Sequence, residues 1–158
     1  MRKNLFSAAM SLMVISAIFV LADVANAQMR RAVYSKEYVE QLLERIEERC
    51  DAFSNQLNKS LDRSRLDGSR TEDNIADRSR DLENATDELR REYDHNDTRG
   101  ENKPEARKIM VTATTIDGIM KRRNFSQAAE SNWLRLRSEL NILAKVYGLP
   151  SVGARAYR

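Results

Sequence analysis

Apolar residues recur at alternating intervals of three and four positions along nearly the whole chain after residue 34. An average interval of 3.5 residues keeps one apolar stripe of a helix facing a partner helix. No comparable run has apolar residues at every second position, so the sequence predicts helices and no sheet. The side chains that we expect to anchor the core are Leu43, Ile46, Phe53, Leu82, Leu89, Ile116, Trp133, Leu136, Leu140 and Leu143.

Residues that end or begin helices divide this rhythm into four segments. The turn Asp67-Gly68-Ser69 offers a break and a new N-cap, although a kinked continuous helix is a second interpretation there. A polar stretch over 95–103 leads into Pro104, which is favoured at the first position of a helix. Ser126 is the expected cap of the last segment, and Gly148 followed by a proline predicts its end.

These segments predict an all-α domain over 35–149, built as an up-down antiparallel four-helix bundle or as two packed helical hairpins. Residues 28–34 form an N-terminal segment, and residues 150–158 are expected to be a flexible tail. A first helix over 35–66 makes the first hairpin longer than the second. We therefore expect part of its apolar stripe to lie bare or to be covered by a partner.

The first 27 residues have the three parts of a signal peptide. Two basic residues are followed by an uncharged, mostly apolar run over 5–22, and Ala25 and Ala27 are the small residues that a signal peptidase reads. We expect cleavage before Gln28 and export to the periplasm or the extracellular space, with no transmembrane segment left. An uncleaved membrane anchor is the alternative, because 18 apolar residues come close to the roughly 20 that span a bilayer.

Few residues are candidates for catalysis or for metal binding. The single histidine excludes every multi-histidine metal site, and the loop after Asp94 has Arg99 where a calcium loop needs glycine. Cys50 has acidic neighbours, which oppose formation of a thiolate, so it either lies in the core or pairs between chains. Acidic and basic residues three and four positions apart are typical of a solvated, ion-paired helix face. The sequence predicts no enzyme activity, no cofactor and no metal.

Charge is divided unevenly along the chain. Residues 69–97 carry ten acidic and five basic side chains, whereas residues 98–158 carry five acidic and twelve basic ones. This complementarity predicts how the two hairpins dock or how two chains pair head to tail. The expected basic patch consists of Lys121, Arg122, Arg123, Arg135 and Arg137. An anionic envelope surface is an alternative target for it, while export and the lack of stacking aromatics argue against nucleic acid.

Two sequence patterns carry a resemblance to known proteins. The first is Leu-Asp-Arg-Ser-Arg-Leu-Asp-Gly-Ser over 61–69, and the second runs from Trp133 to Leu140 and continues through Leu143-Ala144 to Tyr147. The chain resembles a group of small, uncharacterised exported bacterial helical proteins, which implies an exported helical domain and no particular activity. It is unlike the periplasmic stress chaperones built from helical hairpins, because their LTxxQ motif is absent.

The sequence therefore predicts a non-enzymatic helical protein of the cell envelope that acts through contacts with a protein or with itself. Two alternatives are a periplasmic holdase or regulator that binds apolar peptides and a binder of anionic envelope components.

Overall fold

The computed structural model describes residues 34–95 and 98–154, and these residues form four helices and no strand. The helices are α2 (Lys36–Asp62), α3 (Arg70–His95), α4 (Lys103–Arg122) and α5 (Gln127–Tyr147). The expected signal peptide, with Ala25, Ala27 and Gln28 at its cleavage point, lies outside the described residues. Processing at that point therefore stays a prediction.

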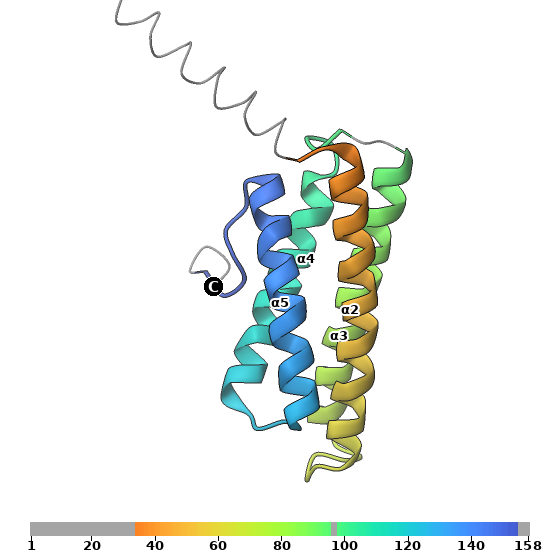
Figure 1. Cartoon of the computed structure of the whole chain (residues 1–158). Helices are drawn as coiled ribbons and strands as arrows, with labels where there is room; N and C mark the ends of the chain where they lie inside the picture. The colour runs from red at the N-terminus through yellow and green to blue at the C-terminus, as the bar shows by residue number, and fades with distance from the viewer. Residues whose placement is uncertain (1–33, 96–97, 155–158) are drawn as a thin grey trace, which may run out of the picture. The chain divides into compact units, whose positions relative to one another are not determined.

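Helices α2 to α5 form an all-α, up-down four-helix bundle, which confirms the predicted fold class (Figure 1). Helix α2 packs against α3 and α5, α3 also packs against α4, and α4 packs against α5. Each hairpin thus consists of two helices that follow one another in the sequence, and the hairpins meet along α2 with α5 and α3 with α4. Short connections favour this arrangement of neighbouring antiparallel helices.

The core is an apolar stripe contributed by all four helices. Each of the ten side chains expected to anchor it has an exposed fraction of 3% or less. The rings of Phe53 on α2 and Trp133 on α5 lie 5.1 Å apart between centroids, so the two hairpins are joined by an aromatic contact. Ser79, which occupies an apolar slot of α3, donates a hydrogen bond to Ser54 Oγ of α2 at 3.1 Å. Pairing the two hydroxyls removes most of the penalty for burying them.

The break between the first two helices is a turn and not a kinked continuous helix. Helix α2 ends at Asp62, four residues before the predicted end at residue 66. The Ser64 side chain accepts a hydrogen bond from the Leu66 backbone amide, which offers the chain an alternative to further helical turns. Gly68 then takes the left-handed region at φ 70°, and Ser69 Oγ accepts from the Glu72 amide as an N-cap.

The prediction that part of the apolar stripe of the first hairpin lies bare or needs a partner is wrong for the far end of that hairpin. Leu61 and Ile75, at the end of that hairpin, are both buried. The connection between α4 and α5 extends to this end of the bundle, where the Ser126 backbone amide donates to Ser60 Oγ at 2.8 Å. Although α4 and α5 are shorter than α2 and α3, their connecting loop therefore reaches the end of α2.

The prediction of a flexible C-terminal tail is wrong for residues 150–154. After the left-handed Gly148, the chain turns back beside α5 (Figure 1). Val152 is buried, and its backbone amide donates to Asn141 Oδ1 of α5 at 2.9 Å. The Gly153 amide donates to Thr114 Oγ1 of α4 at 3.0 Å. Two backbone donors and one apolar side chain hold this short segment, which we call the strap, against α4 and α5.

Candidate binding pocket between α4 and α5

Asp117 is a carboxylate buried within the bundle, with 3% of its side chain exposed. Three groups from α4 and α5 surround it. Lys121 Nζ lies 2.6 Å from Oδ2, Arg137 Nε lies 3.3 Å from Oδ1, and the Trp133 indole N–H donates to Oδ1 at 3.3 Å. Such partners are what a buried charge requires, because an isolated carboxylate is costly to remove from water.

The strap closes over this carboxylate. Gly153 lies so near that a Cβ built on it would stand 2.7 Å from Asp117 Oδ2, and its φ of 82° is one that other residues rarely adopt. Only glycine meets both requirements without strain. Asp117 is thus covered by the strap on one side and by α5 on another.

Two hollows share the pair Asp117–Lys121. The first has a volume of about 300 Å³ and is lined by Asp117, Met120, Lys121, Arg123, Asn124, Glu130, Trp133, Leu134 and Arg137. We call it the α4–α5 pocket. The second, of about 450 Å³, is lined mainly by α4 and Gly153 of the strap. The α4–α5 pocket combines apolar side chains with three cationic groups, and its size lies at the lower end of ligand sites.

The five residues predicted to form a basic patch do not share one surface. Lys121 and Arg137 hold Asp117, and Arg123 lines the same pocket. Arg122 lines the second hollow. Arg135 lies two residues from Arg137 on α5, and positions two apart face different sides of a helix. The patch is therefore divided, because closeness in sequence does not place residues on the same side of a helix.

A separate basic surface runs along the exposed side of α4. Its members recur at helical spacing and consist of Arg107, Lys108, Val111, Thr115 and Arg122. We call it the α4 stripe. Val111 lies within it and is 45% exposed, which places an apolar side chain among cationic neighbours.

An acidic surface lies between the other two helices. Glu47 and Asp51 of α2 face Glu83 and Asp87 of α3, and we call these four residues the acidic seam. Burial and then the charges of Asp51 and Asp87 raise the pKa of Glu83, although a hydrogen bond with Ser54 opposes this. Burial and then the charges of Glu47 and Asp51 raise the pKa of Asp87. Arg80 near Glu83, and Arg90 and Arg91 near Asp87, oppose these shifts without reversing them. The repulsion that remains favours a further cationic partner at the seam.

Cys50 lies beneath the acidic seam with 1% of its surface exposed. Burial, together with the nearby carboxylates and against a hydrogen bond with Thr86, raises the pKa of its thiol to about 12. Of the two sequence interpretations, the core position is correct, and pairing between chains would require the bundle to open.

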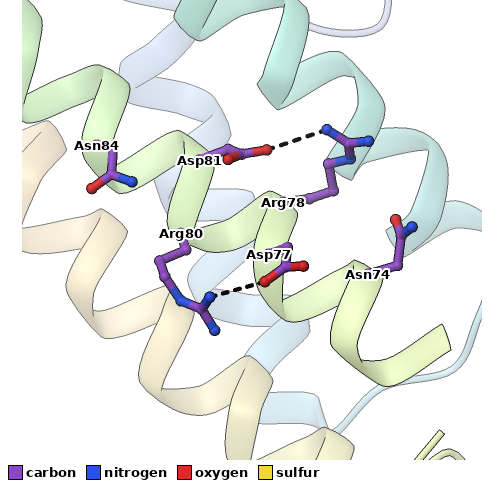
Figure 2. A pocket seen from close by; sticks show the side chains of 6 residues that line it. All are labelled: Asn74, Asp77, Arg78, Arg80, Asp81 and Asn84. Atoms are coloured by element: carbon purple, nitrogen blue, oxygen red, sulfur yellow. Dashed lines mark hydrogen bonds and ion pairs between the residues drawn. The ribbon is translucent and has the colours of Figure 1, made fainter. Parts of the chain in front are cut away.

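A further hollow, of about 360 Å³, lies on the surface of α3. Figure 2 shows that its charged groups pair within the helix, Arg78 with Asp81 and Arg80 with Asp77. These pairs cancel locally, so this hollow presents little net charge to a ligand.

Acidic α3 packs against basic α4, and the role of the charge asymmetry in docking the hairpins stays a prediction. Two ion pairs between the hairpins have the opposite polarity, because they run from Arg45 and Arg49 of α2 to Glu139 of α5. The basic partner is thus on the first hairpin. Arg90 of α3 pairs with Glu47 of α2, inside the same hairpin. Helices α2 and α3 together carry sixteen acidic and nine basic residues, whereas α4 and α5 together carry four acidic and eight basic residues.

Sequence reasoning missed Asp117, the central residue of the pocket. A signal was present, since an acidic residue stands directly after a core position, Ile116, and four residues before Lys121. Such i, i+4 pairs are common on exposed helix faces, so the spacing alone does not indicate burial.

Within the described ranges, no helix is both long and apolar enough to cross a membrane, and no group of three or more potential metal ligands occurs. Comparisons of the chain with protein-family models, curated proteins and solved structures return no match.

Proposed function

We propose that this chain is an exported, non-enzymatic helical protein of the cell envelope that works by contacts between copies of itself, pairing the acidic seam of one copy with the α4 stripe of the next. The observation that carries the proposal is the segregation of charge between the two hairpins. Helices α2 and α3 carry sixteen acidic and nine basic residues, whereas basic residues outnumber acidic ones on α4 and α5.

The two surfaces fit one another chemically. Asp51 and Asp87 of the acidic seam are exposed, and like charges there disfavour ionisation of Glu83 and Asp87. Arg107 and Lys108 of the α4 stripe are exposed and, among the described residues, take part in no ion pair. Bringing the surfaces together relieves repulsion in the seam and covers the apolar Val111.

A contact between two different surfaces is heterologous, so each copy keeps one free acidic seam and one free α4 stripe. Such pairing extends into chains of molecules unless geometry closes a ring. The envelope location rests on the signal-peptide pattern ending at Ala27. Mass spectrometry of the extracytoplasmic protein tests it, with an N-terminus at Gln28 expected and an intact membrane-bound Met1 as the contrary result.

Sedimentation velocity of the mature chain tests the self-association. We expect species larger than the monomer at about 20 mM salt and mostly monomer at about 0.5 M, because the Debye length falls well below 10 Å. A monomer at every concentration in low salt contradicts the proposal. Association that does not change with salt would assign the contact to apolar surface instead.

A second candidate is binding of an anionic envelope surface by the α4 stripe. The exposure of Arg107, Lys108 and Arg122 on one side of α4 favours it. Co-sedimentation with vesicles tests this candidate, with binding expected only when the vesicles contain anionic lipid. The holdase alternative has less support, since Val111 and Leu134 are the large apolar side chains exposed among the described residues.

A further inference from the structure

We propose that the α4–α5 pocket binds a carboxylate that carries a short apolar group, such as a fatty acid or the C-terminus of a polypeptide. The site is independent of the self-association proposed above, because neither the acidic seam nor the exposed Arg107 and Lys108 lines it.

The cationic part of the pocket exceeds what the buried carboxylate requires. Asp117 is held by both Lys121 and Arg137, yet 60% of the Lys121 side chain and 32% of the Arg137 side chain remain exposed. Arg123 lines the pocket as a third cation, and no acidic side chain of the described residues lies within ion-pair distance of it. Glu130 is the second acidic group of the lining, and its Oε1 accepts a hydrogen bond from the Phe125 backbone amide.

These positions favour an anion over a cation. Arg123 and the exposed part of Lys121 can both donate to a carboxylate, and hydrogen bonds between charged groups are about twice as strong as neutral ones. The Asn124 side chain, also in the lining, offers an amide donor beside them. Asp117 itself stays directed at its three partners and keeps Arg137 and Lys121 in place.

The apolar side chains of the pocket favour a ligand that carries an apolar group beside its carboxylate. Met120, Trp133 and Leu134 contribute to the lining, and Leu134 is 62% exposed, more than any other large apolar side chain of the described residues. A ligand that places a short chain or ring over Leu134 removes that surface from water. A volume of about 300 Å³ limits the ligand to a small group.

Trp133 makes the proposal directly measurable, because it is the single tryptophan of the chain and its indole N–H is bonded to Asp117 at the pocket wall. The mature protein is titrated with octanoate and, separately, with N-acetylphenylalanine, while tryptophan emission is recorded. The uncharged counterparts, octanol and N-acetylphenylalanine amide, serve as ligand controls. We expect saturable changes with at least one carboxylate and none with its neutral counterpart. The carboxylate that binds more tightly identifies the fatty acid or the polypeptide C-terminus as the source.

Two variants with the same change of charge assign the binding to the pocket. Arg123→Gln is expected to weaken carboxylate binding about tenfold, as loss of one charged hydrogen bond does. Arg135→Gln, on another side of α5, is expected to change it less than about twofold. Equal loss in both variants, equal binding of acid and neutral counterpart, or no saturable signal with either acid overturns the proposal. Circular dichroism of both variants confirms that each remains folded.

Discussion

The α carbon of Gly153 lies so close to the carboxylate of Asp117 that a Cβ on Gly153 would stand 2.7 Å from Oδ2. This contact joins the end of the described chain to α4. It is possible because Gly153 has no Cβ and adopts a φ of 82°. The strap therefore helps to cover the most buried charge of the second hairpin.

Replacing Gly153 by alanine tests this contact. Gly153→Ala introduces both a clash with Asp117 and an unfavourable positive φ, so we expect a loss of about 1–3 kcal/mol in the free energy of unfolding. Urea titration measures it. Gly100→Ala is the matched control, because a Cβ at Gly100 meets nothing within 4 Å. Equal stability of Gly153→Ala and the parent would mean that the strap does not hold this position.

Trp133 connects the core to the candidate pocket. It packs against Phe53 and is 3% exposed, so Trp133→Ala removes a large buried side chain at the contact between hairpins. We expect a loss of about 3–5 kcal/mol in the free energy of unfolding. Thermal melting followed by circular dichroism checks this. A melting temperature within a degree or two of the parent, as for a surface substitution, would contradict the buried position.

Cys50 should be unreactive in the folded protein. With 1% of its surface exposed and a pKa raised to about 12, the thiol is neither accessible nor ionised at pH 8. We expect a thiol reagent to label it only at the rate at which the bundle opens, and fully in denaturant. Because the pKa is raised on folding, the stability linked to this thiol is present below its unfolded pKa of about 8.5 and is lost as pH rises further. Fast labelling without denaturant would contradict the core position.

The acidic seam should cost stability at neutral pH. Asp51 raises the pKa of both Glu83 and Asp87, and groups whose pKa is raised on folding stabilise the protein at low pH and lose that contribution as pH rises. Asp51→Asn should therefore increase the free energy of unfolding by about 0.2–1 kcal/mol at pH 7, with little effect near pH 3.

Glu48→Gln on the same helix is the control for this substitution, since Glu48 does not contribute to either raised pKa. Urea unfolding of both variants at the two pH values separates a specific effect of the seam from a general reduction of negative charge. An identical increase in the free energy of unfolding in both variants would show that the effect does not come from repulsion within the seam.

The fold could be predicted from the sequence because one periodic signal extends over all four helices. The spacing places one apolar stripe on each helix, and packing these stripes together is the main way to remove them from water. The buried residues include one from each helix: Leu43, Leu82, Ile116 and Leu140. The α2 boundary was less predictable, since Ser64 ends regular hydrogen bonding through a side-chain contact that has no periodic signature.

The pocket and the strap could not be predicted in the same way. The strap is held by Asn141 and Thr114, two polar residues whose backbone partners are distant in sequence. Asp117 is buried because Arg137 and Trp133 come to it from another helix, which no local pattern records. Arg135 and Arg137 are close in sequence, yet the helical period places them on different sides of α5.

Pairing between the acidic seam and the α4 stripe is the central claim, and a charge-exchange experiment tests it most directly. One variant carries Asp51→Lys and Asp87→Lys, and a second carries Arg107→Glu and Lys108→Glu. None of these positions lines the α4–α5 pocket or belongs to the buried core. The first variant has two basic and two acidic residues in the seam in place of four acidic ones, and the second has two acidic residues and Arg122 in the α4 stripe. Each variant alone therefore loses the charge complementarity of the parent, so each should sediment as a monomer at low salt.

Mixing the two variants restores complementary surfaces. The unchanged α4 stripe of the first variant meets the unchanged acidic seam of the second, which is the same pair of surfaces as in the parent. Sedimentation velocity of the equimolar mixture at about 20 mM salt is the decisive measurement, because surface charges are then only weakly screened. The account predicts a mixed complex that neither variant forms alone. A mixture that sediments as the two monomers, or single variants that associate as well as the parent, would contradict it.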